Sequence, residues 1–329
     1  MDTERGSVET VPLTSMMKKS YGEHLKEVVK KRVPAVFKDK VGFPPMRKWT
    51  HRIDMGDAQP MKKFGRPLTP LEHEAIRHFV DEGIKEGVIE DSDLPWSSLL
   101  LPVPKKDSMP CICVDYRALN QLTKPNAYPL PQIEESYQNL AGTKYFTSLD
   151  LQSGYWQVCL AEEDKEKTAF TCQYGHYQFR VMPFRLINTP TTFQNMMNDL
   201  LREFINKSAM VYLDDIIIFS QTEEEHIKNV LAIVRALEKE GLILNEAKCM
   251  WGQPSILYLG HIASGEGLCP NLDKIEAILK WPSCTTITEV RGFLNIAGYY
   301  RCFIWGFAKE VSPLYKLLEG SLCKGTPIH

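Results

Sequence analysis

The chain has 329 residues and a formal net charge of -2, and 43% of its residues are hydrophobic and 24% charged. This balance is typical of a globular chain with room for about two domains. It excludes a protein whose bulk positive charge attracts nucleic acid, so any such site has to be a local basic groove. The nine Cys residues show no disulfide spacing, and we expect free thiols in a reducing compartment.

The first 45 residues show little that specifies structure. We expect residues 1–45 to form a weakly ordered lead-in, in which a short helix from His24 to Val33 is interpreted as solvated or as part of a linker. The start of the chain has no apolar leader, and apolar runs such as Ile216–Ile218 are too short to cross a membrane. These features predict no signal peptide, no transmembrane segment and no membrane partner. They favour the cytoplasm, with the nucleus left open.

A mixed and basic stretch follows the lead-in and precedes a helix with clear start signals. Its basic residues are Arg47, Lys48, Arg52, Lys62, Lys63 and Arg66. The helix is predicted to begin at Thr69, because Thr69 can cap it, Pro70 suits its first turn and Glu72 completes a capping box. Residues 97–103 and 111–116 then predict two strands of a hairpin, joined by a polar turn.

The rest of the chain alternates helices with hairpins and lacks the repeated strand–helix–strand units of a parallel sheet. The elements that we expect are helices over 132–140, 191–205, 223–240, 271–281 and 288–304, a strand over 145–151, and hairpins over 168–181 and 255–262. This order predicts an α+β fold built on an antiparallel sheet.

The most informative stretch is residues 211–220, where two short runs of β-branched and aromatic residues flank Asp214 and Asp215. Such runs predict a hairpin with the acidic pair at its turn. Burying two neighbouring carboxylates is costly unless a cation offsets their repulsion. A solvated acidic turn is the alternative, because Asp is a favoured turn residue.

A third carboxylate, Asp150, ends the strand predicted over 145–151 and can meet Asp214 and Asp215 on a neighbouring strand. Three carboxylates can bind two Mg²⁺ ions about 3.5–4 Å apart. In such a site one ion activates a 3′-hydroxyl, and the other holds the triphosphate and the leaving pyrophosphate. The sequence has no phosphate-binding P-loop, no His-Glu-x-x-His and no Gly-x-Ser-x-Gly motif that would supply a competing chemistry.

From about Thr69 to Ile304 the sequence resembles the reverse transcriptase of long-terminal-repeat retrotransposons of the gypsy or Ty3-like class. The matching pieces, in the family's order, are residues 114–120, 128–131, 149–151, 153–155, 167–170, 181–184, 212–215, 259–260 and 299–301. The resemblance implies a right-hand polymerase with fingers, a palm built on an antiparallel sheet, and a helical thumb. The implied bounds are 46–124 and 158–188 for the fingers, 125–157 and 189–265 for the palm, and 266–329 for the thumb or the start of a connection.

The resemblance also implies an RNA-directed DNA polymerase that adds deoxynucleotides to a primer on an RNA or DNA template, in the cytoplasm or in virus-like particles. Asp150, Asp214 and Asp215 would be the catalytic residues and the ligands of two Mg²⁺ ions, with Mn²⁺ as a substitute. Tyr155 would lie under the incoming sugar and select deoxynucleotides. A core tyrosine beside Trp156 is the alternative for that residue.

Other site residues follow from the same resemblance. The nucleotide-binding residues would be Tyr155, Phe184, Arg185, Lys105 and Lys106. Leu259 and Gly260 would form the primer grip, where a glycine lets the backbone approach the primer strand. Arg117 would brace the fingers with Asp115 as its partner.

Three positions depart from the family pattern. Relatives carry an Arg that holds the triphosphate where this chain has Cys111, which cannot pair with phosphate. Arg185 replaces a Gly, so its side chain either blocks the pocket or supplies the missing charge. Thr189 replaces a smaller Ala or Ser, a milder change.

The loss of one charge-assisted phosphate contact costs about 1.5–3 kcal/mol, or about ten- to a hundredfold in affinity. The sequence therefore predicts weakened activity, with Cys111→Arg and Arg185→Gly expected to raise nucleotide incorporation. The main alternative is a non-catalytic nucleic-acid-binding remnant of a retrotransposon polymerase. A purely structural protein and a cyclase-type enzyme with the same carboxylates are further alternatives. The oligomeric state is left open.

Overall fold

The computed structural model describes residues 13–38, 41–45, 48–63, 66–105, 108–129, 131, 140 and 142–318. The chain groups into two compact units. The N-terminal unit comprises Met1–Asn139 and Thr143–Pro254, and the C-terminal unit comprises Leu140–Gly142 and Ser255–His329. The helix expected over 132–140 lies almost entirely outside the described residues. Within them, no helix is both long and apolar enough to span a membrane.

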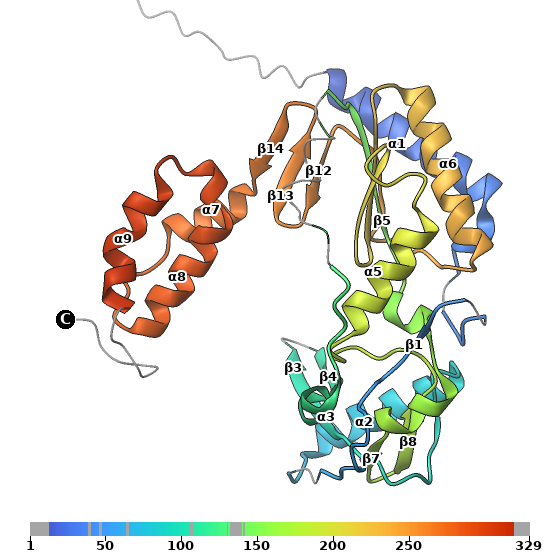
Figure 1. Ribbon diagram of the computed structural model, residues 1–329. Helices are drawn as coiled ribbons and strands as arrows, with labels where there is room; N and C mark the ends of the chain where they lie inside the picture. Colours follow the sequence, from blue (N-terminus) through green and yellow to red (C-terminus); the bar gives the residue numbers. More distant parts are fainter. Residues whose placement is uncertain are drawn as a thin grey trace, which may run out of the picture. The chain divides into compact units, whose positions relative to one another are not determined.

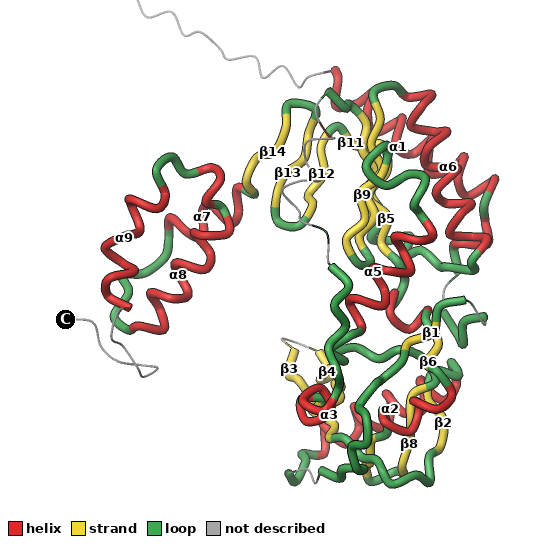
Figure 2. Tube along the Cα trace, in the orientation of Figure 1, coloured by secondary structure: helices red, strands yellow, loops and turns green. Residues whose placement is uncertain are grey.

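A four-stranded antiparallel sheet, which we call the central sheet, has the strand order β11-β5-β10-β9. It lies beside α1 and α6 in the N-terminal unit (Figure 2). Its strands are β5 (Tyr145–Asp150), β9 (Ala209–Tyr212), β10 (Asp215–Ser220) and β11 (Met250–Gln253). Ile216, Ile217 and Ile218 of β10 are fully buried, as the run of β-branched residues predicts. The antiparallel sheet and the acidic hairpin between β9 and β10 are thereby confirmed.

Three helices pack with this sheet around one hydrophobic core (Figure 1). They are α1 (Leu13–Arg32), α5 (Thr189–Leu200) and α6 (Glu223–Lys239). The apolar stripe of α5 is buried as predicted, with Phe193, Met196 and Met197 at 0–1% exposure. This packing fixes α5 beneath the hairpin that carries the acidic pair.

Helix α1 corrects the expectation of a weakly ordered lead-in with a solvated helix. Leu25, Val29 and Val33 are fully buried in the core that the sheet shares with α5 and α6. Gly22 lets the helix approach β11 closely, because a Cβ at that position would lie 2.5 Å from the backbone oxygen of Trp251. The stretch from residue 21 onward is therefore part of the fold, and lysines between its apolar positions obscure this in the sequence.

The other elements of the N-terminal unit surround a second core. They are β1 (Thr50–His51), α2 (Pro70–Lys85), β2 (Ile89–Asp91), β3 (Leu99–Lys105), β4 (Ser108–Asp115), α3 (Arg117–Leu122), η3 (Gly154–Gln157), β6 (Cys159–Leu160), η4 (Glu162–Thr168), β7 (Phe170–Cys172) and β8 (Gly175–Phe179), with η1 (Pro34–Val36) beside the first core. The hairpins β3–β4 and β7–β8 match the predicted ones. Helix α2 begins with the predicted capping box, in which the Glu72 N–H donates to Thr69 Oγ1 over 3.3 Å.

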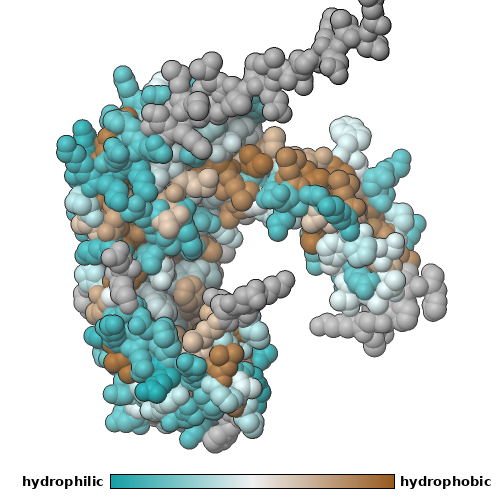
Figure 3. Space-filling view, turned by 180° about the vertical axis from the view of Figure 1, so that it is seen from behind, coloured by the Kyte–Doolittle hydropathy of each residue, from teal (hydrophilic) through white to brown (hydrophobic). Residues whose placement is uncertain are grey.

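The C-terminal unit joins a three-stranded antiparallel sheet to helices. The strands are β12 (Ser255–Tyr258), β13 (His261–Ser264) and β14 (Gly267–Pro270), and the helices are α7 (Leu272–Leu279), α8 (Ile287–Tyr299), η5 (Arg301–Phe303) and α9 (Phe307–Leu318). Val290, Leu294 and Val311 form its small core, and many of its other hydrophobic side chains face solvent (Figure 3). The unit begins at Ser255, whereas the sequence assigns residues up to 265 to the palm.

Candidate active site

The three predicted carboxylate residues meet at one end of the central sheet. Asp215 at the start of β10 lies directly opposite Asp150 at the end of β5. Asp215 also pairs with Tyr212, so Leu213 and Asp214 form a two-residue turn between β9 and β10. Leu213 has φ 56°, which is the positive φ that a type II′ hairpin turn requires at its first central residue.

The acidic turn is held by residues that the sequence analysis did not single out. Gln194 of α5 is fully buried, and its Oε1 accepts from the Leu213 N–H at 2.7 Å. Its Nε2 donates to the Val211 carbonyl at 3.1 Å. Gly154 allows close approach from the other side, because a Cβ there would lie 3.2 Å from Asp214 Cβ. One signal in the sequence could have revealed Gln194: it is a polar amide next to the apolar residues of the predicted helix.

The carboxylates are crowded and partly removed from water. Burial raises the pKa of Asp215 to about 6, and the charges of Asp214 and Asp150 add to this rise, while Lys248 opposes it. Burial also raises the pKa of Asp150, an effect that Lys248 reduces and Asp214 reinforces. The Lys248 Nζ lies 3.6 Å from Asp150 Oδ1, and it is a second site residue that the sequence analysis missed.

The donor set fits hard divalent cations, because carboxylate oxygens are the ligands that Mg²⁺ prefers. Burial is the main cause of the raised pKa values of Asp150 and Asp215, and a bound cation would favour the ionised form of both carboxylates. As the side chains stand, the described part of the chain holds no cluster of three or more His, Cys, Asp or Glu residues in metal-binding geometry.

Tyr155 lies next to the acidic turn. Its ring centroid is 5.2 Å from that of Phe184 and 5.3 Å from that of Phe193. Burial and the charges of Asp214 and Tyr212 raise the pKa of Tyr155 to about 12. The ring is thus anchored in the core on one side and borders the acidic site on the other, while its contact with a sugar stays a prediction.

Two of the departures from the family pattern meet in one cavity. Cys111 of β4 and Arg185 line a cavity of about 600 Å³ together with Trp156, Pro183 and Phe184. Arg185 adopts φ 72°, in the left-handed region that favours glycine. The side chain of Lys105 and the whole of Lys106, which were also predicted to bind nucleotide, lie outside the described parts of the structure.

One further expectation for the fingers is met by a contact. Arg117 pairs with Asp115, with 2.6 Å between Arg117 Nη2 and Asp115 Oδ2, which confirms the predicted partnership. The Thr189 hydroxyl is buried and donates to the Pro183 carbonyl at 3.1 Å. Thr189 therefore closes the loop that carries Arg185, which a smaller Ala side chain would not do.

The predicted primer-grip pair lies in the C-terminal unit. Leu259 and Gly260 form the two-residue turn between β12 and β13, with φ 46° and 78°, as a type I′ turn requires. The Tyr300 hydroxyl donates to the Gly260 carbonyl at 2.9 Å, and the Tyr299 hydroxyl donates to the Leu259 carbonyl. The turn is therefore held from its backbone side by the Tyr-Tyr pair that the sequence analysis matched separately.

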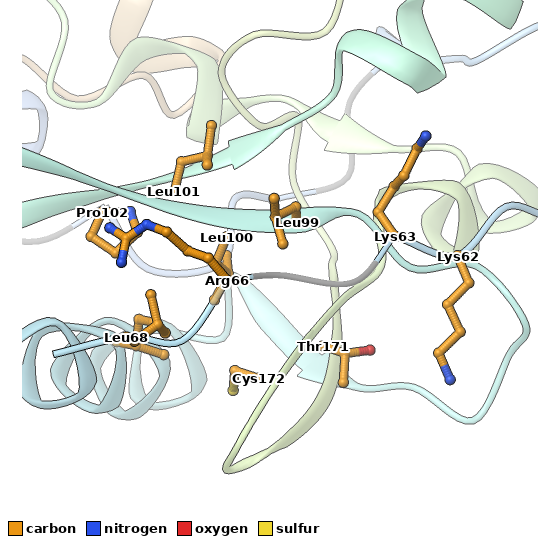
Figure 4. Close-up of a pocket in the computed structure, with 11 residues that line it drawn as sticks. Lys62, Lys63, Arg66, Leu68, Leu99, Leu100, Leu101, Pro102, Thr171 and Cys172 are labelled. Carbon is orange, nitrogen blue, oxygen red and sulfur yellow. The ribbon is translucent and has the colours of Figure 1, made fainter. Parts of the chain in front are cut away.

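A second cavity, of about 530 Å³, lies beside β3 and contains none of the predicted site residues (Figure 4). Leu99, Leu100 and Pro102 contribute to its apolar lining, and Lys62, Lys63 and Arg66 contribute positive charge. Figure 4 shows the Lys62 and Lys63 side chains pointing in opposite directions, with Arg66 beside Pro102. The Arg66 guanidinium is paired with Glu72, with 3.2 Å between Arg66 Nη1 and Glu72 Oε2. Lys62 and Lys63 are therefore the lining cations that a bound anion would meet first.

Comparisons with known proteins agree with this geometry. Residues 103–263 match the family model of the reverse transcriptase (RNA-dependent DNA polymerase). The chain is similar in fold to the foamy viral protease–reverse transcriptase in complex with double-stranded DNA, with a TM-score of 0.83, 22% identity and coverage of 99% of this chain and 70% of that one. A foamy viral complex with an RNA/DNA hybrid gives a TM-score of 0.81 at 21% identity, over 99% of this chain and 45% of that one.

Relatives in sequence are retrotransposon polyproteins. The chain is 36% identical over 274 residues to the retrovirus-related Pol polyprotein from transposon 297 of Drosophila melanogaster, covering 82% of this chain and 26% of that protein. It is 34% identical over 307 residues to the Pol polyprotein from Drosophila transposon gypsy, covering 92% and 30%. With the Tf2-3 polyprotein of Schizosaccharomyces pombe, identity is 35% over 253 residues, covering 77% and 19%. The chain thus spans less than a third of the length of these relatives.

The fold and the acidic hairpin define a right-hand polymerase of mixed α and β structure. Within that class, the chain belongs to the RNA-directed DNA polymerase family, as the reverse transcriptase domain of gypsy/Ty3-type retrotransposon Pol polyproteins.

Proposed function

We propose that this domain adds deoxynucleotides to the 3′-hydroxyl of a primer paired with an RNA or DNA template. The proposed location is the cytoplasm, with the nucleus and virus-like particles as alternatives. The observation that carries the proposal is the meeting of Asp150 and Asp215 in register, with Asp214 in the adjoining turn. Similar foamy viral proteins have been seen with double-stranded DNA and with an RNA/DNA hybrid, which supports a paired template and primer as the substrate.

Asp150, Asp214 and Asp215 are proposed to hold two Mg²⁺ ions, with Mn²⁺ as a substitute. Bound divalent ions would activate the primer hydroxyl and stabilise the charge on the triphosphate. The protein's own contribution is to present the three carboxylates together. Gln194 fixes the turn that carries Asp214, and Lys248 offsets part of the negative charge of Asp150.

The nucleotide would lie between the acidic hairpin and the cavity that Cys111 lines. We propose Tyr155 and Phe184 as contacts of the sugar and Arg185 as a phosphate contact, with Lys105 and Lys106 reaching the triphosphate from the fingers. Because Arg185 and Cys111 line the same cavity, Arg185 is well placed to supply the positive charge that Cys111 lacks. This arrangement favours the charge-supplying role of Arg185 over the blocking one.

The subdomain bounds are proposed as fingers at 46–124 and 158–188, palm at 125–157 and 189–265, and thumb or start of the connection at 266–329. The grouping of β12 with the C-terminal helices supports an earlier end of the palm, near Pro254. Leu259 and Gly260 are proposed as the primer grip. The rigid turn that Tyr299 and Tyr300 support would present its backbone to the primer strand.

Lys62 and Lys63 are proposed to contact phosphates of the template strand, whereas Arg66 is already paired with Glu72. The spread of these two lysines along one cavity supports contact with consecutive phosphates. The double variant Lys62→Ala/Lys63→Ala should weaken binding to a primer–template duplex. The slope of the logarithm of the binding constant against the logarithm of the salt concentration should become shallower, by the amount expected for the loss of about two phosphate contacts.

The decisive experiment is primer extension on a primed RNA template with Mg²⁺ and then with Mn²⁺. Asp214→Asn/Asp215→Asn should abolish extension, whereas Asp93→Asn, a change at an exposed acid of the same unit, should leave it intact. Extension that survives the double substitution would contradict the assignment of the carboxylates.

The second candidate function is that of a non-catalytic nucleic-acid-binding protein. It is favoured by the two replacements at the nucleotide site, Cys111 in place of an Arg and Arg185 in place of a Gly. In that case the wild-type protein shows no extension with either metal, yet it binds the duplex with a steep salt dependence. Cys111→Arg separates a weakened enzyme from an inactive one. It adds a phosphate-binding cation and should raise incorporation by a weakened enzyme about tenfold or more, and it should leave an inactive protein inactive.

A further inference from the structure

The loop that carries Arg185 is held to α3 by Asn120, the last residue of the matching stretch 114–120, to which the sequence analysis gave no role. Asn120 lies on α3, and its Nδ2 donates to the Arg185 carbonyl at 2.8 Å. Its Oδ1 accepts from the Ile187 N–H at 2.9 Å. One amide thus closes a ring around Leu186 and fixes the backbone on both sides of it.

A second asparagine makes the same kind of connection in the opposite direction. Asn188, on the loop, accepts from the Asn126 N–H at 2.9 Å and donates to the Lys124 carbonyl at 2.8 Å. Asn188 is 9% exposed, so its hydrogen bonds are mostly shielded from water. Four hydrogen bonds from two amides therefore join the segment 120–126 to the loop 185–188.

The backbone at Arg185 needs such a restraint. A side chain at φ 72° is less stable than a glycine by about 1–2 kcal/mol. Two hydrogen bonds from Asn120, with Leu186 buried at 4% exposure, oppose the relaxation of this residue to negative φ. The conformation in turn sets where the guanidinium lies, and it lies near enough to Asp115 to help lower the pKa of that carboxyl, after the larger effect of Arg117.

We propose that Asn120 is a positioning residue for nucleotide binding, which acts by holding Arg185 at the cavity shared with Cys111. This inference rests on the proposed function, because it assumes that the cavity takes the phosphates of a deoxynucleoside triphosphate. It adds that Arg185, which lines the cavity together with Cys111 of β4, is held to α3 by one amide. Asn120→Ala should therefore weaken nucleotide binding without any loss of a direct contact.

The test combines a measurement on the loop with one on the nucleotide. Hydrogen exchange at the Ile187 amide should become faster in Asn120→Ala and stay slow in Gln121→Ala, a change at the exposed neighbour on the same helix. Asn120→Asp keeps the acceptor for Ile187 and loses the donor for Arg185, so it should keep that amide protected. It therefore serves as the variant to examine if Asn120→Ala does not fold.

The nucleotide measurement uses deoxythymidine triphosphate and the complex of the full chain with a primed poly(rA) template, with Ca²⁺ to prevent turnover. Asn120→Ala and Asn120→Asp should raise the Kd for the nucleotide about three- to tenfold. In an Arg185→Ala background the same changes at Asn120 should have no further effect, because the side chain that they position is gone. A purely structural role of Asn120 would instead give additive effects.

The outcomes separate this inference from the proposed function. If the wild-type complex binds no deoxythymidine triphosphate, the proposed nucleotide site is wrong, and slow exchange at Ile187 would still show the clamp. If the wild-type complex binds it and Asn120→Ala binds it equally well, the positioning role is overturned while the proposed polymerase stands. An equal loss with and without the Arg185 side chain would also overturn it.

Discussion

Arg185 carries two opposing roles within one residue. Its backbone occupies a conformation that glycine adopts without cost, and its side chain brings a cation to the cavity that Cys111 lines. A glycine here would free the backbone from strain but leave the cavity without that charge. Replacing Arg185 by Gly or Ala is therefore expected to weaken nucleotide binding, whereas only Gly is expected to raise stability. This expectation replaces the gain in incorporation that the sequence alone predicts for Arg185→Gly.

Arg185→Gly should stabilise the fold by up to about 1 kcal/mol, because relief of the left-handed strain exceeds the extra entropy of glycine in the unfolded chain. Arg185→Ala keeps the strain and serves as the matched control, with little or no gain expected. Urea unfolding of the three proteins measures the difference. Equal stability of the Gly and Ala variants would show that this position is not strained.

The sequence predicts the three carboxylate residues of the candidate site better than the residues that hold them. Asp150, Asp214 and Asp215 stand at strand ends, so the strand pattern alone places them together. Gln194 and Lys248 reach the site through side chains whose direction depends on how helices and loops pack. Because no local pattern records that packing, they become visible only in the folded structure.

At the scale of elements, α1 packs against β11 with the two backbones in close contact at Gly22. Gly22→Ala should destabilise the protein by about 1–3 kcal/mol, because the new methyl group would lie 2.5 Å from the Trp251 carbonyl oxygen. Gly292→Ala in α8 is the matched control, since its Cβ would make only ordinary contacts at 3.5 Å or more. That change should be neutral or stabilise by up to about 1 kcal/mol. Thermal unfolding of both variants tests the sign, and a stabilising Gly22→Ala would contradict this close contact.

The contact between α1 and β11 explains why the helix expected over His24–Val33 was wrongly expected to be solvated. Residues 1–12 of the predicted lead-in lie outside the described part of the chain. The apolar residues of α1 lie at helical spacing, but lysines and glutamates between them lower the average hydrophobicity to that of a solvated helix. What decides burial is the partner surface on β11, some 200 residues later in the chain. The predicted hairpins, by contrast, depend on near neighbours in sequence and agree with the structure.

Helix α6 is fastened to two strands of the central sheet by His226, which is fully buried. The His226 ring lies 2.8 Å from the Thr147 hydroxyl and 3.2 Å from the Ser220 hydroxyl. Burial lowers the pKa of His226 to about 4 from its ordinary value of 6.5. The unfolded chain therefore binds a proton at a higher pH than the folded one, and stability falls as the pH drops from about 6.5 to 4.

Replacing this histidine should flatten the acid side of the stability curve. Between pH 6.5 and pH 4, protonation of His226 in the unfolded chain lowers the free energy of unfolding by up to about 3 kcal/mol, and His226→Gln should remove this contribution. His78→Gln, at an exposed position, should leave the curve unchanged. Denaturant unfolding at several pH values measures the slope. Some slope should remain in His226→Gln, because burial also lowers the pKa of His51 to about 4.

At the scale of the whole molecule, the boundary between the two compact units near Pro254 is also the boundary between the hydrophobic cores. Both large cores lie within the residues up to Pro254, and the small core of Val290, Leu294 and Val311 lies beyond it. The three carboxylates all belong to the N-terminal unit, while the proposed primer grip belongs to the C-terminal one. Metal binding and primer binding should therefore be separable by truncation.

A fragment of residues 1–254 should unfold cooperatively and keep its response to divalent cations. Because a ligand that binds only the folded state stabilises it, Mn²⁺ should raise the Tm of this fragment and that of the full chain by similar amounts. Asp215→Asn should reduce the shift in both, and Asp93→Asn should not.

The fragment should bind a primer–template duplex more weakly than the full chain at the same salt concentration, because it lacks Leu259 and Gly260. A fragment that is folded yet indifferent to Mn²⁺ would contradict the metal assignment, and one without a cooperative transition would show that the N-terminal unit depends on the C-terminal one.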